Sequence, residues 1–456
     1  MHPPEKPPET PSPQRRAYGF FLDVRSVFTT RIATLSLKFG ASILLARALG
    51  PDDRGLLTAI ILIPFLLVSI TEAGIRQSAA YHISKKIFSD PQVFAGLVLI
   101  FVTFSTAGVM LSLYVFDNFG FEEVPLSTRI LASMIIPLGL VLSYSSGIFL
   151  GKRQIVRFNR TFWIPEALRV TLLLSIFLTI NLTVELAISA QLVASISICC
   201  YAVHLLSSII KLKLSINWKV IKSLLNIGMG FGLSLFLIIL NYKISTLILH
   251  RFSTSEQVGY FAVALTLAEL IWQLPTVLNS LLFERSATRT KGRDFSFKVL
   301  ALMRLTVGAA AIASIGMISV APFLIPLAFG TEFSPSIPVL AALLPGMVLM
   351  CVFKILVSEM GGMGHPWLSL LATVPSIIIN AAIGFMLVPS LGAIGAGAAT
   401  SIAYFFSSAI YCLVYSRVVG ISLFKIVLPR KTDFAFLAES VPGMSRFLSA
   451  KFNIKF

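Results

Sequence analysis

Long apolar runs constrain the fold of this chain more than any other feature of its sequence. Twelve runs of about twenty or more mostly apolar residues follow one another, and a helix of about 20 such residues crosses the roughly 30 Å hydrocarbon core of a bilayer. Only 12% of the residues are charged and 56% are hydrophobic, whereas about a quarter are charged in a typical soluble domain. The sequence therefore predicts an all-α integral membrane protein with about twelve transmembrane helices. The expected spans are residues 27–49, 57–81, 93–116, 130–150, 162–181, 186–210, 223–249, 258–283, 299–321, 337–361, 367–388 and 394–416.

The distribution of lysine and arginine gives these spans an orientation. The chain has 37 of these residues against 20 acids, a net charge of +17. If the N-terminus is inside, 26 of the 37 fall in inside segments and three in outside loops, while the other eight lie within spans. Cytoplasmic loops carry this kind of excess. We therefore expect both termini in the cytoplasm, and the positive charge does not point to a nucleic-acid partner.

The segments outside the spans are short, which argues against an enzyme. The longest expected outside loop, residues 117–128, has about a dozen residues, whereas membrane glycosyltransferases, polymerases and ligases usually need a sizeable loop or domain for their chemistry. The four cysteines lie in apolar runs without metal-binding spacing, and the five histidines are scattered. We expect no catalytic residue, no metal site and no cofactor.

An internal repeat appears at an offset of 204 residues. The segment SILLARALGPDDRG, which ends at Gly55, aligns with TLILHRFSTSEQVG, which ends at Gly259, and Arg47 then matches Arg251. An even number of expected spans separates the two segments, so both repeats have the same orientation in the membrane. The repeat predicts two six-helix lobes.

The spans and the repeat together divide the chain into five parts. We expect a disordered, Pro-rich cytoplasmic tail with a short juxtamembrane segment over residues 1–26. The two lobes are expected at 27–210 and 223–416, with a cytoplasmic linker at 211–222 between them. A basic cytoplasmic tail, 417–456, follows the second lobe.

Charged residues inside the spans are the candidates for function. A charge at the bilayer centre costs at least about 2.5–3.5 kcal/mol on insertion scales, so such residues usually face a partner or a watery cavity. The eight bases outnumber the four acids, which leaves the interior positive. These residues are Arg31, Lys38, Arg47, Arg76, Arg169, Lys243, Arg304 and Lys354, with Glu72, Glu166, Glu269 and Glu359.

Helical spacing predicts where some of these side chains point. Arg31 and Lys38 lie on one face of the first span, with Lys38 near the midplane, and Lys243 lies in the seventh span. Glu269 belongs to a polar stripe of the eighth span that repeats every three or four residues. A polar stripe against lipid would be costly, so we expect these faces to point inward.

Other charges also have a simpler explanation as ion pairs within the bundle. Glu72 with Arg76 is spaced four residues apart and Glu166 with Arg169 three, which suits self-neutralising pairs. Five charges lie within about two turns of a span end, where they can snorkel to the interface: Arg31, Arg47, Arg169, Arg304 and Glu359. A structural role and a cavity-lining role stay open for Arg76, Glu166, Arg169, Lys354 and Glu359.

The order of several short segments resembles a known family. LLARALGPDDRGLLTAI is followed by TEAGIRQSAAYHIS in the first half, and the second half contains SEQVGYFAVALTLAEL, LAFGTEFSPSIPVLAALLPG and VPSLGAIGAGAATSIAY. In this order, and within twelve spans, these segments resemble the polysaccharide-biosynthesis, O-antigen flippase-like proteins of the multidrug/oligosaccharidyl-lipid/polysaccharide (MOP) exporter superfamily. The resemblance covers most of residues 20–420.

The resemblance implies a fold and a function. The fold is a V-shaped bundle like that of multidrug and toxin extrusion (MATE) transporters, with the first and seventh helices lining a central cavity. The implied function is to flip an oligosaccharide on polyprenyl diphosphate across the bacterial inner membrane, in a pathway shared with a polymerase and glycosyltransferases. On this hypothesis Lys38 and Lys243 bind the diphosphate and Arg31 helps recruit it, while Glu269 or Glu72 senses a coupling ion.

Two other functions compete with this hypothesis. A MATE antiporter has the same frame, but it exports organic cations, which suits an acidic cavity better than a basic one. A non-transporting membrane partner in a polysaccharide synthesis complex is the third reading.

Overall fold

The protein is nearly all helical in a computed structural model that describes residues 13–210, 216–287, 293–428 and 433, and no strand occurs in those residues. The helices, with η for 3₁₀ turns, are α1 (Pro13–Thr71), α2 (Ile75–Lys85), α3 (Asp90–Asn118), α4 (Leu126–Ser133), α5 (Ile135–Gly151), α6 (Ile155–Thr179), α7 (Val184–Ser207), α8 (Trp218–Phe252), α9 (Ser255–Ala268), η1 (Glu269–Trp272), α10 (Gln273–Ala287), α11 (Arg293–Phe329), η2 (Thr331–Phe333), α12 (Ser336–Gly362), η3 (Pro366–Ser369), α13 (Leu370–Val419) and α14 (Leu423–Val427).

Ten helices in the described part of the chain are long and apolar enough to cross a membrane. The chain is therefore a multi-pass membrane protein, although the sequence predicted about twelve spans. Two of the ten, Thr29–Lys85 and Pro366–Val419, have 57 and 54 residues, and each covers two of the expected spans. Each contains a kink at a glycine, Gly50 with φ 72° and Gly392 with φ 54°. Glycine adopts this left-handed conformation without a Cβ clash, so the chain turns where the sequence placed a short loop.

Two of the expected spans are not continuous helices. Between α1 and α2 the chain leaves the helical conformation, with Ala73 and Gly74 at φ 46° and 66°. Between α9 and α10 the turn η1 intervenes, shortly before Pro275, which has no N–H to continue the helical hydrogen bonds. Non-helical backbone within a membrane is tolerated where it is buried in protein or lines a watery cavity. Glu72 and Glu269 lie at these two breaks.

The predicted boundaries of the terminal and linking segments are only partly described. The helix α1 begins at Pro13, so helix replaces the expected disordered tail from that residue onward; proline is well tolerated in the first turn of a helix, and no glycine follows it until Gly19. Residues 1–12 and 211–215, and 429–432 and 434–456 of the basic tail, lie outside the described residues.

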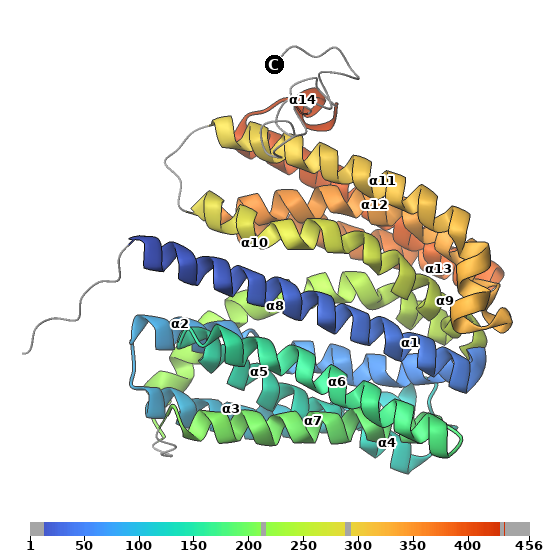
Figure 1. Ribbon diagram of the computed structural model, residues 1–456, viewed down its shortest axis with the longest axis horizontal. Coiled ribbons are helices and arrows are strands. Elements are labelled where there is room, and N and C mark those ends of the chain that lie inside the picture. The colour runs from blue at the N-terminus through green and yellow to red at the C-terminus, as the bar shows by residue number, and fades with distance from the viewer. Residues whose placement is uncertain (1–12, 211–215, 288–292, 429–432, 434–456) are drawn as a thin grey trace, which may run out of the picture.

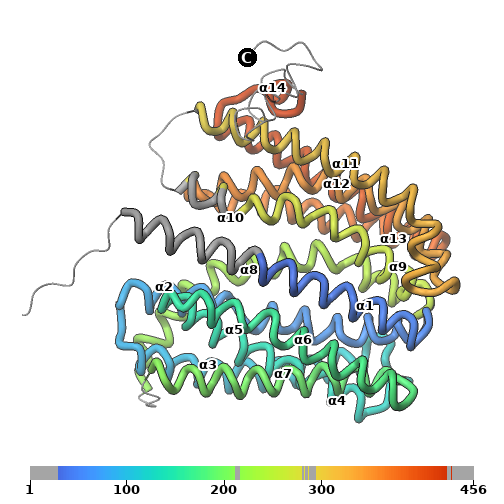
Figure 2. Tube along the Cα trace, in the orientation of Figure 1, coloured from blue at the N-terminus to red at the C-terminus, as the bar shows by residue number. Residues whose placement is uncertain are grey.

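The helices form two groups, which Figures 1 and 2 show above and below α1. Buried apolar residues form two clusters: one runs from Ala41 to Leu224, and the other consists mainly of residues from Ile248 to Ile426. Helix α1 contributes to both clusters, since Leu45 lies in the first and Ala46 in the second. The predicted all-α bundle with two lobes is confirmed.

The two repeats meet at the turns that the alignment matched. A Cβ on Gly55 would lie 1.7 Å from the Ser255 carbonyl oxygen, and a Cβ on Gly259 would lie 2.0 Å from the Pro51 carbonyl oxygen. The contact is reciprocal, because Pro51 and Ser255 are themselves 204 residues apart. In Figure 1 the two groups lie closest at this end of the molecule and diverge toward the end where α1 begins.

The start of the basic tail is tied to the second lobe by a buried ion pair. Arg304 in α11 binds Asp433 through two nitrogens at 2.5 and 2.6 Å, and both side chains are less than 10% exposed. The same guanidinium donates to the carbonyl oxygens of Lys425 and Ile426 in α14. Arg304, which the sequence placed near a span end where it could snorkel, therefore holds the segment after α13 against α11.

Candidate functional site

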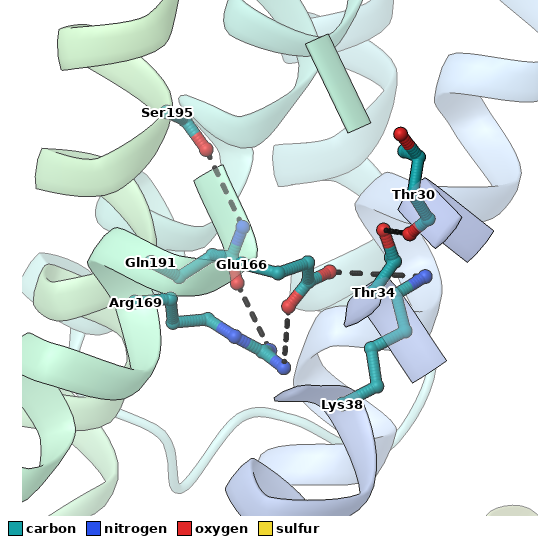
Figure 3. A network of polar contacts seen from close by, with 7 residues as sticks. All are labelled: Thr30, Thr34, Lys38, Glu166, Arg169, Gln191 and Ser195. Atoms are coloured by element: carbon teal, nitrogen blue, oxygen red, sulfur yellow. Dashed lines mark hydrogen bonds and ion pairs between the residues drawn. The ribbon is translucent and has the colours of Figure 1, made fainter. Parts of the chain in front are cut away.

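Lys38 lies in a network of polar side chains on the first lobe (Figure 3). Its Nζ is 3.7 Å from Glu166 Oε1 in α6, and the Lys38 side chain is 57% exposed. The other oxygen, Glu166 Oε2, is 3.0 Å from Arg169, so one carboxylate serves two cations. The long distance and the exposure make the Lys38 contact the weaker of the two. Lys38 is therefore available to a stronger anion.

A second layer fixes the orientation of this network. Arg169 donates to Gln191 in α7 at 3.0 Å, and the Gln191 amide donates in turn to Ser195 at 3.3 Å. Thr34, one turn before Lys38, donates its hydroxyl to the Thr30 carbonyl oxygen. The contacts of Arg169 and Gln191 hold the guanidinium beside Glu166 in one orientation.

The second lobe carries a similar pair. Lys243 in α8 lies 3.5 Å from Glu269 Oε1 in η1, and the two side chains are 27% and 40% exposed. Like Lys38, Lys243 is held loosely by a carboxylate of its own lobe. Each lysine lies beside a carboxylate of a neighbouring helix or turn, and both lysine side chains stay partly exposed.

The polar stripe that includes Glu269 faces α1. Arg31 donates from Nε to Gln273 Oε1 at 3.5 Å, and Ser42 lies 3.4 Å from Thr266, hydroxyl to hydroxyl. Gln273 and Thr266 flank Glu269 at helical spacing, so the first helix of one lobe runs along the polar face of the other. Arg31, Lys38, Lys243 and Glu269 thus belong to one inner region.

Glu72 and Arg76 form an ion pair at the break between α1 and α2. Arg76 Nε lies 3.4 Å from Glu72 Oε1, with 31% and 16% of the side chains exposed. The spacing argument assumed a continuous helix, which the structure replaces with a turn. The pair nevertheless forms because the turn keeps the two side chains close.

Two further candidates lie within the second lobe. Lys354 in α12 lies over the rings of Tyr242 and Trp272, 4.8 and 4.3 Å from their centroids, and donates to the Tyr242 hydroxyl. Glu359 is fully buried and accepts hydrogen bonds from Ser296 and Tyr415, both at 2.7 Å. Tight packing of this kind suits a structural role, and neither residue contacts the two lysine pairs through a hydrogen bond or ion pair that the described residues contain.

One cation of this region was missed in the sequence. Arg54 was assigned to an outside loop, but it lies in the continuing helix and donates back to Ser42 at 3.4 Å and to Thr58 at 3.1 Å. Its Nε is buried without a hydrogen-bond partner, and Arg169 is near enough to repel it. The described residues contain no carboxylate within 4.0 Å of it. Arg54 and Ser42 are twelve residues apart, so in a straight helix their side chains would be too far apart to touch. The reversal of the chain at Gly50 brings them into contact.

The region as a whole carries an excess of positive charge. Arg31, Lys38, Arg54, Arg169 and Lys243 are balanced by two carboxylates, Glu166 and Glu269. Among the described residues no three His, Cys, Asp or Glu side chains group as a metal site. The arrangement suits the binding of an anion, because these cations outnumber the carboxylates that could neutralise them.

Comparison with known proteins identifies the family. A sequence family described as "Polysaccharide biosynthesis protein" matches residues 23–283, more than half of the chain. The chain belongs to this family. A comparison with curated protein sequences finds no match. The predicted membership in a polysaccharide-biosynthesis family is confirmed.

Several solved structures of transporters have the same fold as this chain. The lipid II flippase MurJ in an inward closed conformation has a TM-score of 0.71 at 16% identity, covering 95% of this chain and 99% of that one. An inward-facing multidrug resistance MATE family transporter of the MOP superfamily also scores 0.71, at 15% identity, covering 85% and 94%. A MOP superfamily transporter from Pyrococcus furiosus Vc1 (DSM3638) scores 0.60 at 14% identity, covering 87% and 95%, and is described as having a binding pocket of reversed polarity. The fold is that of the MOP superfamily transporters.

Proposed function

We propose that the protein flips a glycan linked to polyprenyl diphosphate across the bacterial inner membrane, for surface polysaccharide biosynthesis. The observation that carries this proposal is the pair of loosely held, partly exposed lysines, Lys38 and Lys243, on the first helix of each lobe. Membership in a polysaccharide-biosynthesis family supports the glycan as cargo. The similarity of the fold to that of a lipid flippase supports the mode of transport.

The chemistry of the cargo matches the charge of the region. A lipid-linked sugar diphosphate carries about two negative charges, and its hydrated headgroup cannot enter hydrocarbon without replacement of its solvation. Ammonium groups bind phosphate oxygens through strong charge-assisted hydrogen bonds. We propose that the diphosphate displaces Glu166 from Lys38 and Glu269 from Lys243, while Arg169 keeps Glu166 in place.

The residues at the two ends of this region take different roles in the proposal. Arg31 lies toward the end where the lobes diverge, and it recruits the diphosphate there. The opposite end is closed by the contact of Gly55 with Ser255. Transport then requires this contact to open while the divergent end closes, which is alternating access around a site between repeats.

Glu269 and Glu72 are proposed to sense the coupling ion. Each lies at a break in its span, and each is bound to a single cation, Lys243 or Arg76, by a contact longer than 3.3 Å. When the diphosphate takes Lys243, Glu269 loses its partner. A proton or a sodium ion then replaces the lost charge, which links ion binding to cargo binding.

The proposed orientation places the divergent end in the cytoplasm. Both termini then lie on the side where the glycan is assembled, in agreement with the distribution of lysine and arginine. The glycosyltransferases that supply the cargo act before this protein, and the polymerase that consumes it acts after, so we propose them as partners in the same pathway.

Reconstituted vesicles test the function directly. We expect a labelled polyprenyl-diphosphate glycan to move between leaflets only when the protein is present, as measured by its modification by a membrane-impermeant reagent. Efflux of an organic cation without glycan movement would instead support the MATE-type antiporter. Absence of both activities would support the non-transporting partner.

Arg54 offers a second test that separates function from structure. Arg54 belongs to the positively charged region, and we propose that it also attracts the diphosphate. We expect Arg54→Gln to slow flipping by about tenfold, the effect of losing roughly 1.4 kcal/mol of binding to the diphosphate. The melting temperature of the Arg54→Gln variant should equal or exceed that of the wild type, because the substitution removes a buried charge that has no carboxylate partner among the described residues. Arg54→Lys keeps the charge and should retain most of the rate. A loss of stability with normal flipping per folded molecule would show that Arg54 is structural.

A further inference from the structure

Arg47 joins the first helix of one lobe to the end of a helix in the other lobe. Its Nε donates to the Ala328 carbonyl oxygen at 2.8 Å, and its Nη2 donates to the Leu327 carbonyl oxygen. Both acceptors lie in the last turn of α11, which ends at Phe329. The sequence placed Arg47 near a span end, where it could snorkel to the interface. In the structure its exposed side chain instead connects the two lobes.

The two carbonyl groups are ones that α11 itself leaves unpaired. The last four carbonyl groups of an α-helix have no N–H partner within that helix. At the end of α11 the Pro326 carbonyl oxygen accepts from the N–H of Gly330 at 3.1 Å. The next two carbonyl oxygens accept from Arg47, whose positive charge also complements the negative end of the helix dipole. Arg47 therefore caps α11 from the opposite lobe.

The internal repeat contains a matching contact at the same end of the molecule. The helices α3 and α11 are the third expected spans of their lobes, and each leads into a glycine with positive φ, Gly120 at 85° and Gly330 at 112°. Beyond α3, the ring of Phe121 stacks on His250 with 4.2 Å between the centroids. His250 lies near the end of α8, the first helix of the second lobe. Each lobe therefore places the end of its first helix against the end of the other lobe's third span.

The two matching contacts differ in chemistry. The repeat aligns Arg47 with Arg251, but among the described residues Arg251 makes no hydrogen bond or ion pair, and its guanidinium lies 6.0 Å from the centroid of the neighbouring Phe252 ring. The contact of His250 is an aromatic stack. Of these two contacts, the one made by Arg47 consists of hydrogen bonds from a charged group.

We infer that Arg47 is a positioning residue that keeps the closed end of the transporter closed. The inference rests on the proposed function, whose cycle requires this end to open and close, and it adds the group that sets the balance between the two states. Gly55 and Ser255 bring the repeats together through close backbone packing. Arg47 adds charge-assisted hydrogen bonds, which are stronger than those between neutral groups.

The exposure of Arg47 suits a contact that breaks and forms repeatedly. When the lobes separate at this end, water replaces the guanidinium on the two carbonyl oxygens, so the exchange leaves no polar group without a partner. The hydrogen bonds of Arg47 favour the closed state alone. An interaction that favours one of two states shifts their populations by its free-energy difference. Loss of Arg47 should therefore shift the protein toward the state that is open at this end.

Two thiol probes in the full chain test the inference, in a background without the four native cysteines. Thr266→Cys lies just inside the closed end, because Thr266 contacts Ser42, which is five residues before Arg47. Thr34→Cys lies about 20 Å from Arg47 along α1, toward the divergent end. A membrane-impermeant thiol reagent is applied from the closed end for the first probe and from the divergent end for the second, in vesicles of opposite orientation. Arg47→Gln should raise the labelling rate of the first probe at least about fivefold and lower that of the second.

Three measurements separate a shift of state from loss of structure. Arg251→Gln is the matched control, because Arg251 is also exposed and occupies the equivalent position of the repeat, and it should change neither labelling rate. Arg47→Lys keeps the charge but carries its donors on one nitrogen, so it should raise labelling of the first probe by only about twofold. The melting temperature of Arg47→Gln should stay close to that of the wild type.

Other results would overturn the inference. Faster labelling of both probes in Arg47→Gln, or a lower melting temperature with unchanged labelling, would show that Arg47 only stabilises the fold. If Arg47→Gln does not fold, unchanged labelling in Arg47→Lys would contradict the inference in the same way.

The outcome is separate from that of the flipping assay. Opposite changes at the two probes without glycan movement would overturn the proposed cargo alone, because Arg47 acts on the lobes and not on the cargo. Glycan movement with unchanged labelling in Arg47→Gln would overturn this inference alone.

Discussion

Loss of both loosely held lysines should nearly abolish flipping. We expect Lys38→Ala and Lys243→Ala each to slow movement of the labelled glycan by about 10- to 100-fold, since a hydrogen bond to a charged group is worth about 1.5–3 kcal/mol. The double variant should be slower than either single variant, because in the proposed function the two lysines bind the same diphosphate from opposite lobes. The measurement is the initial rate in reconstituted vesicles, normalised to folded protein.

The controls for this experiment separate charge from structure. Lys38→Arg and Lys243→Arg keep the cation and should retain most of the rate. Lys219→Ala removes an exposed lysine from the same helix as Lys243 and should have no effect. If both single alanine variants flip the glycan at the normal rate, the lysines do not bind the diphosphate, even if the fold is right.

Forcing the contact between the repeats apart with a methyl group should have the second large effect. We expect Gly55→Ala to force the turns apart, since its Cβ would lie 1.7 Å from the Ser255 carbonyl oxygen, a backbone atom that cannot swing away. Overpacking of this kind typically costs about 1–3 kcal/mol. Flipping should fall at least tenfold, because in the proposed cycle the state that receives cargo from the divergent end depends on this contact as its seal.

Distance measurements show whether the seal is the cause. Spin labels at Asp52 and Glu256, both exposed beside the contact, should report a longer mean distance in Gly55→Ala than in the wild type. Gly40→Ala is the matched control on the same helix, because a Cβ there meets nothing within 4 Å. An unchanged distance together with lost transport would mean that Gly55 acts in another way.

Local patterns in the sequence predicted the class of fold and the family. Apolar runs report directly on the bilayer, so the helical membrane bundle followed from them. The alignment of Gly55 with Gly259 identified the repeat, but it did not reveal that the two turns pack on each other. That contact depends on how the lobes are placed in space, which a self-alignment does not contain.

The features that the sequence missed arise from backbone geometry and long-range pairing. Hydropathy depends on how apolar the side chains are and does not depend on backbone hydrogen bonding. It therefore predicted continuous spans through Glu72 and Glu269, where the helices are interrupted. The reversal at Gly50 moved Arg54 from an expected loop into the charged region. Asp433 pairs with Arg304, 129 residues earlier in the chain. Helical spacing relates only residues three or four positions apart, so it could not predict this pair.

Thiol labelling beside Lys38 tests the central claim most directly. Thr34→Cys places one thiol a turn from Lys38 (Figure 3), in a background where Cys199, Cys200, Cys351 and Cys412 are replaced. We predict that a negatively charged thiol reagent reacts at least about tenfold faster than a positively charged one of equal size, as a positive cleft concentrates anions. Lipid-linked diphosphate glycan should protect the thiol. No reaction with either reagent, or faster reaction with the positive one, would contradict a water-filled, cationic chamber for an anionic cargo.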